Sequence, residues 1–223
     1  MNQRTWRQVS WRSLWALIGA SVMVASWMAE FPVAAEPVND GIVPTANYSP
    51  QCMAWTYTYQ QNCRADNATH SYYMDSNAAM ELETPDRAEV NAAMSRWDDN
   101  TDVDVVYDSS PVFSGAGETD VIVQEGSFGA PDDISGVTWC EDPQDDATYL
   151  CDQHYIRMRG AGTITETVSG HEIGHTLGFV HPWNWAPSRT ACDAITGIMR
   201  SSASCGGGAA LGDAVKNNAN WVY

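Results

Sequence analysis

The sequence predicts an α+β domain in which one β-sheet packs against two helices. Short runs of β-branched and aromatic residues alternate with turn residues, as is typical of strands. Thr84 followed by Pro85 is a helix start, and residues 163–166, Thr-Ile-Thr-Glu, form a capping-box pattern before a second helix. The chain has 223 residues, which is enough for one well-filled core.

The order of the elements follows from these patterns. Strands are expected at residues 55–59, 70–75, 103–107, 120–124, 136–140 and 155–158. The first helix is expected from its cap, Thr84, to residue 96 or 97, because Val90, Met94 and Trp97 share one apolar face. After residue 181 the chain has few regular patterns, apart from a short terminal helix expected over residues 211–221.

Residues 1–35 have the pattern of a signal peptide. Arg4, Arg7 and Arg12 precede an apolar run over residues 14–28, and Val-Ala-Ala at residues 33–35 resembles a cleavage signal. A signal anchor is the alternative reading, but the small residues favour cleavage. We therefore expect a secreted, extracellular protein without a membrane segment after cleavage. An exposed N-terminal arm is expected at residues 36–51 and one folded domain at residues 52–223.

The cysteines agree with export, because disulfides form in oxidising compartments. All six follow the leader: Cys52, Cys63, Cys140, Cys151, Cys192 and Cys205. Sequence alone leaves their connectivity open. The simplest pairing joins sequence neighbours as 52–63, 140–151 and 192–205, because short loops close easily. A cysteine zinc site is disfavoured, since no C-x-x-C spacing occurs.

The net charge of −17 disfavours two classes of partner. Contacts to nucleic-acid phosphates and to anionic membranes need basic surfaces. We therefore expect no nucleic-acid partner, and we interpret the acidic surface as a source of solubility.

Three histidines lie close together in the sequence SGHEIGHTLGFVH, residues 169–181. Residues four apart share one face of a helix, so His171 and His175 can bind one metal ion. Glu172, about a quarter turn away, can act on a water molecule without binding the metal itself. This H-E-x-x-H spacing is a zinc-protease signature with the glutamate as general base. A buried helix that merely carries histidines is the alternative for these five residues.

The residues that follow favour the metal site. In a continued helix, His181 would lie about 15 Å along the axis from His171. Gly178, which can adopt a left-handed conformation, would instead end the helix and return His181 to the metal. Three histidines with one open coordination position are typical of catalytic zinc. The sequence contains no glutamate after Glu172, so no downstream glutamate competes with His181 as the third ligand. His70 and His154 are expected on the surface or in strands.

Residues 171–181 match H-E-x-x-H-x-x-G-x-x-H at every fixed position, and here the chain resembles the metzincin zinc proteases. Met199, 18 residues after His181, matches the methionine of the metzincin Met-turn, which packs beneath the metal. Within that clan, the chain most resembles compact bacterial-type or matrixin-like catalytic domains. This resemblance implies a mixed, mostly parallel, twisted sheet with an active-site helix, a backing helix and an irregular C-terminal subdomain.

The chain also departs from that family. It has no Pro-Arg-Cys-Gly inhibitory switch, and Ser201 stands where astacins have a tyrosine ligand. The local disulfides are not a matrixin feature. Structural calcium is frequent in matrixins, and the candidate ligands here are Asp132, Asp133, Glu141 and Asp145.

The resemblance implies a monomeric, secreted zinc endopeptidase that cleaves protein or peptide substrates. The three histidines would hold one zinc ion, Glu172 would be the base, and an edge strand near residues 136–139 would bind extended substrate. Trp183 and Trp185 either line the substrate pocket or pack under a disulfide loop. The alternative from another class is a secreted binding or adhesion module on the same scaffold, with little or no catalysis.

Overall fold

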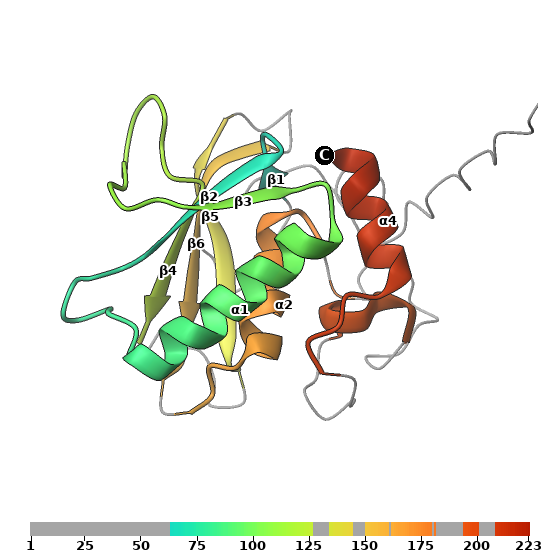
Figure 1. Ribbon diagram of the computed structural model, residues 1–223. Helices are drawn as coiled ribbons and strands as arrows, with labels where there is room; N and C mark the ends of the chain where they lie inside the picture. The colour runs from blue at the N-terminus through green and yellow to red at the C-terminus, as the bar shows by residue number, and fades with distance from the viewer. Residues whose placement is uncertain are drawn as a thin grey trace, which may run out of the picture. The chain divides into compact units, whose positions relative to one another are not determined.

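A computed structural model describes residues 63–126, 134–144, 150–160, 162–179, 181, 194–200 and 208–223 (Figure 1). All of them belong to one compact unit, Pro37–Tyr223. The expected leader, the N-terminal arm and the strand at residues 55–59 lie outside the described residues. No helix in the described ranges is long and apolar enough to span a membrane.

The sheet has six strands and is mixed but mostly parallel, as the metzincin resemblance implied. The strands are β1 (Arg64–Ala65), β2 (Thr69–Met74), β3 (Asp104–Tyr107), β4 (Val121–Glu125), β5 (Gly136–Pro143) and β6 (Leu150–Met158). The main path runs β1-β6-β4-β2-β3, with all neighbours parallel. Among the described strands, β5 pairs only with β6, in the antiparallel direction, and forms an edge of the sheet.

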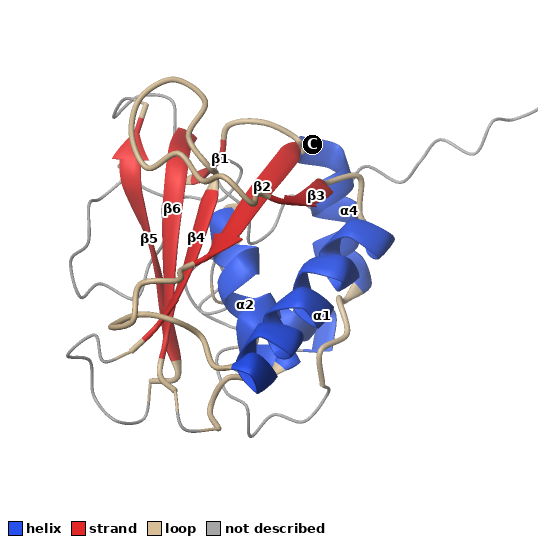
Figure 2. Ribbon diagram, turned by 60° about the vertical axis from the view of Figure 1, so that its left-hand side comes forward, coloured by secondary structure: helices blue, strands red, loops and turns tan. Residues whose placement is uncertain are grey.

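The helices gather on one face of the sheet, which Figure 2 shows from the side. They are α1 (Thr84–Asn100), α2 (Glu166–Thr176), the 3-10 segment η1 (Ala194–Met199) and α4 (Asp213–Val222). Trp97 of α1 joins the two long helices, because its Nε1 donates to the main-chain oxygen of Gly170 at 3.0 Å. Its ring also packs against Phe179, with ring centroids 5.7 Å apart. The shared core therefore holds α2 in place between α1 and the sheet.

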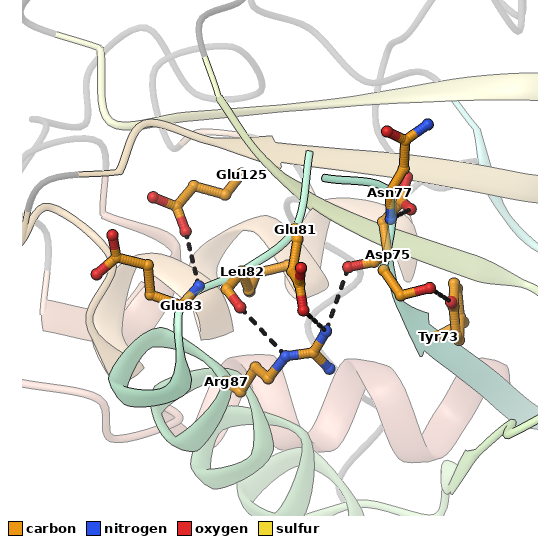
Figure 3. Close-up of polar contacts among 9 residues, drawn as sticks. Tyr73, Asp75, Asn77, Glu81, Leu82, Glu83, Arg87 and Glu125 are labelled. Atoms are coloured by element: carbon orange, nitrogen blue, oxygen red, sulfur yellow. Dashed lines mark hydrogen bonds and ion pairs between the residues drawn. The ribbon is translucent and has the colours of Figure 1, made fainter. Parts of the chain in front are cut away.

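The start of α1 differs by one residue from the prediction. Glu83, not Thr84, is the cap residue, and it makes no side-chain capping bond. Its main-chain N–H instead donates to Oε2 of Glu125 on β4 at 3.1 Å (Figure 3). Arg87, one turn into the helix, donates to the main-chain oxygens of Leu82 (3.2 Å) and Asp75 (3.3 Å). Contacts to the sheet thus fix this helix end, and local capping propensity does not.

The predicted cap residue of α2 was also wrong. Thr165 is the cap, and its hydroxyl accepts from the N–H of Val168 at 3.2 Å. Thr163, the expected cap, donates its hydroxyl to the main-chain oxygen of Arg159. Glu166, its expected partner, accepts from Nε of Arg96 on α1 at 2.5 Å. The capping box is therefore absent because both of its side chains bind elsewhere.

The β5–β6 hairpin is longer than predicted and carries a disulfide. β6 begins at Leu150 instead of residue 155, and β5 continues to Pro143. Cys140 and Cys151 are bonded across the hairpin, with Cα atoms 5.9 Å apart, which confirms the expected 140–151 pair. Cys63 is also disulfide-bonded. Cys52, Cys192 and Cys205 lie outside the described residues, so the other two pairs stay predictions.

His70 and His154 do lie in strands, but the expectation that they could be surface residues is wrong. Both side chains are fully buried, on β2 and β6. Burial lowers the pKa of His70 to about 4 and that of His154 to about 3, where the nearby His70 lowers it further. Sequence patterns cannot detect this, because a strand's inward face is known only once helices cover it.

Candidate metal centre

The site begins with the way α2 ends. Leu177 is the C-cap, and Gly178 has φ +92°, a left-handed conformation that favours glycine. The N–H of Phe179 donates to the main-chain oxygen of Gly174, and that of Gly178 to the oxygen of His175, both at 3.0 Å. This is the double hydrogen bond of a Schellman motif. The turn reverses the chain and carries His181 back towards the helix.

Three imidazoles meet at this turn. Nε2 of His171 lies 2.9 Å from Nε2 of His181 and 3.1 Å from Nε2 of His175. The ring centroids are 4.7 to 5.0 Å apart. Among the described residues, this is the only group of three or more His, Cys, Asp or Glu side chains that could hold a metal ion.

The outer nitrogens of two rings bind main-chain carbonyls. Nδ1 of His171 lies 2.9 Å from the oxygen of Ile198, and Nδ1 of His175 lies 2.7 Å from the oxygen of Phe179. A carbonyl oxygen only accepts, so each Nδ1 carries the proton. In the neutral ring, Nε2 then has a lone pair and no hydrogen. Two such lone pairs face each other at 3.1 Å, so this contact is no hydrogen bond.

A cation between the rings suits this donor set. Zinc binds imidazole nitrogen at about 2.0–2.1 Å, and tetrahedral geometry then separates two nitrogens by about 3.3 Å. The observed 2.9 and 3.1 Å are slightly shorter and would open by a few tenths of an ångström around the ion. Ligating histidines usually donate their second N–H to a carbonyl, as His171 and His175 do here. The residues present therefore fit zinc.

Burial keeps these histidines in the ligating form. It lowers the pKa of His171, and it lowers that of His175 to about 3, where the neighbouring His171 contributes further. Burial and both neighbouring rings also lower the pKa of His181. Neutral imidazoles at ordinary pH leave the Nε2 lone pairs available to a metal ion.

Glu172 follows His171 on α2, and its side chain is buried, with 5% exposed. Burial raises the pKa of its carboxyl to about 7, and a hydrogen bond from Thr138 of β5 opposes that rise. The hydroxyl of Thr138 lies 2.7 Å from Oε2 of Glu172. A carboxyl group with a pKa near 7 can both accept and release a proton close to neutral pH.

The segment at the end of η1 contacts His171 and the α2 helix. Gly197 has φ +51°, and an added Cβ would lie 2.9 Å from the main-chain oxygen of Ala210, so only glycine fits this bend. The bend presents the Ile198 carbonyl to His171 and buries Met199. The sulfur of Met199 packs against the backbone of α2 at Gly174. Met199 thus lies next to the helix that carries two of the histidines.

Several residues of the site have no signal in the sequence. The Ile198 and Phe179 carbonyls are main-chain groups, and Thr138 is far from the histidines in sequence. His70 was not assigned to the site, yet its Nε2 lies 2.7 Å from the hydroxyl of Thr176, which itself donates to the oxygen of Ile173 at 2.7 Å. These contacts join β2 to the last turn of α2.

The remaining predicted site residues are largely untested. Asp132, Asp133, Asp145, Trp183, Trp185 and Ser201 lie outside the described residues. The carboxylate of Glu141 accepts from Nε1 of Trp139 at 2.8 Å. Nothing among the described residues supports a calcium site, since the three histidines form their only candidate metal group.

No protein-family model and no curated protein matches this chain. Among solved structures it is similar to High choriolytic enzyme 1, a hatching enzyme zinc-protease from the medaka fish Oryzias latipes. The match has 17% sequence identity and a TM-score of 0.32, and it covers 59% of this chain and 54% of that chain. The match thus spans about half the length of the fish enzyme. The assignment of the candidate metal site rests on the geometry of the three histidines.

Proposed function

We propose that this chain is a secreted zinc endopeptidase of the metzincin type, with His171, His175 and His181 as ligands and Glu172 as general base. The observation that carries the proposal is the convergence of three Nε2 atoms, together with the buried carboxyl group of Glu172, the residue that follows His171 on α2. Structural zinc sites are usually closed by four protein ligands, whereas three leave a position for water or substrate.

The residues of the chain supply the proton transfers. Zinc, when bound, would supply a Lewis acid that polarises the scissile carbonyl group and makes water more acidic. Glu172 would accept the proton of the attacking water and then donate it to the leaving amine. Burial, which raises the pKa of its carboxyl to about 7, suits both steps. Met199 would support the ligand helix from below, in the role of a Met-turn residue.

The substrate would be an extended stretch of an extracellular protein or a peptide. β5 pairs only with β6 in the described part of the chain, and its start packs against α2 at Glu172. An extended peptide can add to such an edge through main-chain hydrogen bonds. This arrangement would bring the scissile bond alongside Glu172.

Secretion forms part of the proposal. Its support is the leader pattern at residues 1–35 and the Cys140–Cys151 disulfide, which is typical of an oxidising compartment. Amino-terminal sequencing of the exported protein tests it, and we expect a start near residue 36. An uncleaved chain held in the membrane would contradict it.

Cleavage of casein by the purified secreted protein tests the function. We expect one zinc ion per chain, loss of cleavage on chelation and its return on addition of zinc. Glu172→Ala should keep the zinc and lower the rate by at least about 100-fold, as removal of a general base does. Glu81→Ala, which changes an exposed carboxylate of the turn before α1, is the matched control and should cleave normally.

Two results would contradict the proposed enzymatic function. One is a zinc-loaded protein that cleaves neither casein nor a peptide library, which would favour the alternative, a secreted binding or adhesion module. The other is normal cleavage by Glu172→Ala, which would remove the base from its assigned role.

A further inference from the structure

Two residues of the edge strand β5 enclose the carboxyl group of Glu172. The hydroxyl of Thr138 lies 2.7 Å from Oε2 of Glu172 and 3.1 Å from its main-chain oxygen. At Gly136, an added Cβ would lie 2.7 Å from Oε1, 2.8 Å from Cγ and 2.9 Å from Cδ of the same side chain. One carboxylate oxygen is therefore bound by a hydroxyl, and the other fills the space that a side chain would occupy on β5.

The strand register explains why these two residues face the helix. Thr138 pairs with Ile156 and Gly136 with Met158 across the β5–β6 ladder. Directly opposed residues of an antiparallel pair point to the same face of the sheet. Ile156 and Met158 belong to the core under the helices, so Thr138 and Gly136 point towards α2. Val137 and Trp139 alternate to the opposite face.

We infer that Thr138 is a positioning residue for the hydrolysis proposed above: its hydroxyl, with the space left by Gly136, holds the Glu172 carboxyl group in one orientation. This inference rests on the proposed function. A glutamate side chain has several rotatable bonds, and fixing it costs free energy during the reaction unless a partner has fixed it beforehand. Thr138 also lies on the strand proposed to bind substrate, so the base and the substrate are aligned by one element.

The chemistry of the contact supports a role in orientation. An ionised carboxylate only accepts, so the threonine hydroxyl donates to Oε2. A hydrogen bond to a charged group is among the stronger ones in proteins, and its removal leaves a buried carboxylate without that donor. The hydroxyl has one proton, and the shorter distance of 2.7 Å assigns this proton to the side-chain oxygen of Glu172 rather than to its carbonyl.

Variants of the zinc-loaded secreted protein test the role through kinetics. Thr138→Val keeps the shape and removes the hydroxyl, and we expect kcat to fall at least about tenfold while KM stays within about twofold. Thr138→Ser restores a donor and should keep kcat within about threefold of wild type. Thr69→Val, the same substitution at an exposed position of β2, is the control and should change neither constant. Zinc content should stay at one ion per chain throughout.

A second measurement needs neither zinc nor activity. The melting temperature of the chelated protein is compared for wild type, Thr138→Val, Glu172→Ala and the double variant. We expect Thr138→Val to lower it by several degrees when Glu172 is present and by clearly less when residue 172 is alanine, because the two side chains interact. If Thr138→Val lowers the melting temperature equally with Glu172 and with alanine at residue 172, the two side chains do not interact and the inference is wrong.

The outcomes separate this inference from the proposed function. Coupled melting temperatures together with the expected loss of kcat support the positioning role. If the wild-type protein is active and Thr138→Val cleaves normally, the positioning role is wrong. The same holds if Thr138→Val and Thr138→Ser lower kcat equally. In both cases the proposed protease function stands. A wild-type protein that cleaves nothing contradicts the proposed function, and coupled melting temperatures would then identify Thr138 as a structural partner only, which also overturns the positioning role.

Discussion

The sulfur of Met199 packs against Gly174 so closely that a Cβ atom at Gly174 would overlap it. The same Cβ would lie 3.1 Å from Cζ2 of Trp97. Gly174 lies between His171 and His175, the two candidate ligands on α2, where alanine would be the better helix former by about 1 kcal/mol. Close packing of the helix on its support therefore outweighs helix propensity at this position.

Gly174→Ala should lower the free energy of unfolding by about 1–3 kcal/mol, the usual cost of overpacking a core. Urea unfolding of the zinc-free protein measures it. Met199→Ala removes the overlapping sulfur, so the double variant should be more stable than the sum of the two single losses predicts. An increase in stability for Gly174→Ala alone would show that the packing at this position is loose.

Gly178→Ala should weaken zinc binding. Residue 178 has φ +92°, and an added Cβ would lie 2.6 Å from Cβ of Arg64. Strain of about 1–2 kcal/mol together with this clash should displace the turn that carries His181. Gly162→Ala is the matched control, because its φ is +80° but no atom lies within 4 Å of the added Cβ. Competition with a chelator should show weaker zinc binding for Gly178→Ala only, and equal affinities would contradict the role of this turn.

Zinc should raise the melting temperature of the metal-free protein. Without a cation, the lone pairs of His171 and His175 oppose each other at 3.1 Å, and a bound ion removes this repulsion. Free zinc at about 1,000 times its dissociation constant would stabilise the fold by about 4 kcal/mol. His181→Ala should lose most of the shift in calorimetry, and an unchanged shift would exclude His181 as a ligand.

Stability should fall in mild acid because of His154. The unfolded histidine binds a proton below its ordinary pKa of about 6.5. Burial lowers the folded pKa to about 3, so the folded chain stays unprotonated until far lower pH. The stability contributed by neutral His154 is therefore lost as the pH falls from about 6.5 towards 3.

Urea unfolding of the chelated protein at pH 6 and pH 5 measures this effect. Between pH 6 and pH 5, the free energy of unfolding should fall by about 1 kcal/mol more for wild type than for His154→Gln, which has no imidazole at residue 154 to protonate. His171, His175 and His181 are present in both proteins, so the difference reports His154 together with its interaction with His70. The same loss in both proteins would contradict the buried, neutral state of His154.

Breaking the Cys140–Cys151 bond should destabilise the β5–β6 hairpin. The two cysteines are 11 positions apart, and closing a loop of this length contributes about 3 kcal/mol. In denaturant unfolding, the free energy of unfolding of the double variant Cys140→Ala and Cys151→Ala should be about 3 kcal/mol lower than that of wild type. Cys140→Ala alone should lower it by a similar amount, since it breaks the same bond. A loss below about 0.5 kcal/mol would indicate that the strand pairing alone fixes the hairpin.

Local patterns in the sequence predicted most of the elements and the spacing of the candidate ligands, but they did not predict β1 (Arg64–Ala65). Helical periodicity placed His171 and His175 on one face, and the left-handed glycine at residue 178 lies where the spacing to His181 requires a turn. Five of the six predicted strands fall in the described residues. Their starts are correct within one position, except that of β6, which begins at Leu150. These features are local, since they depend on residues a few positions apart.

The contacts that support the candidate site form only when distant segments of the chain pack together. Both helix caps were predicted one or two residues off. Glu125 of β4 binds the N–H of Glu83 at the start of α1, and Arg96 of α1 binds the Glu166 carboxylate that the capping box would have used. The carbonyl of Ile198 orients His171, and the hydroxyl of Thr138 binds Glu172 across 34 positions of sequence. Hydrogen bonds between distant segments leave no periodic pattern in a sequence, so the chain must fold before these partners can be identified.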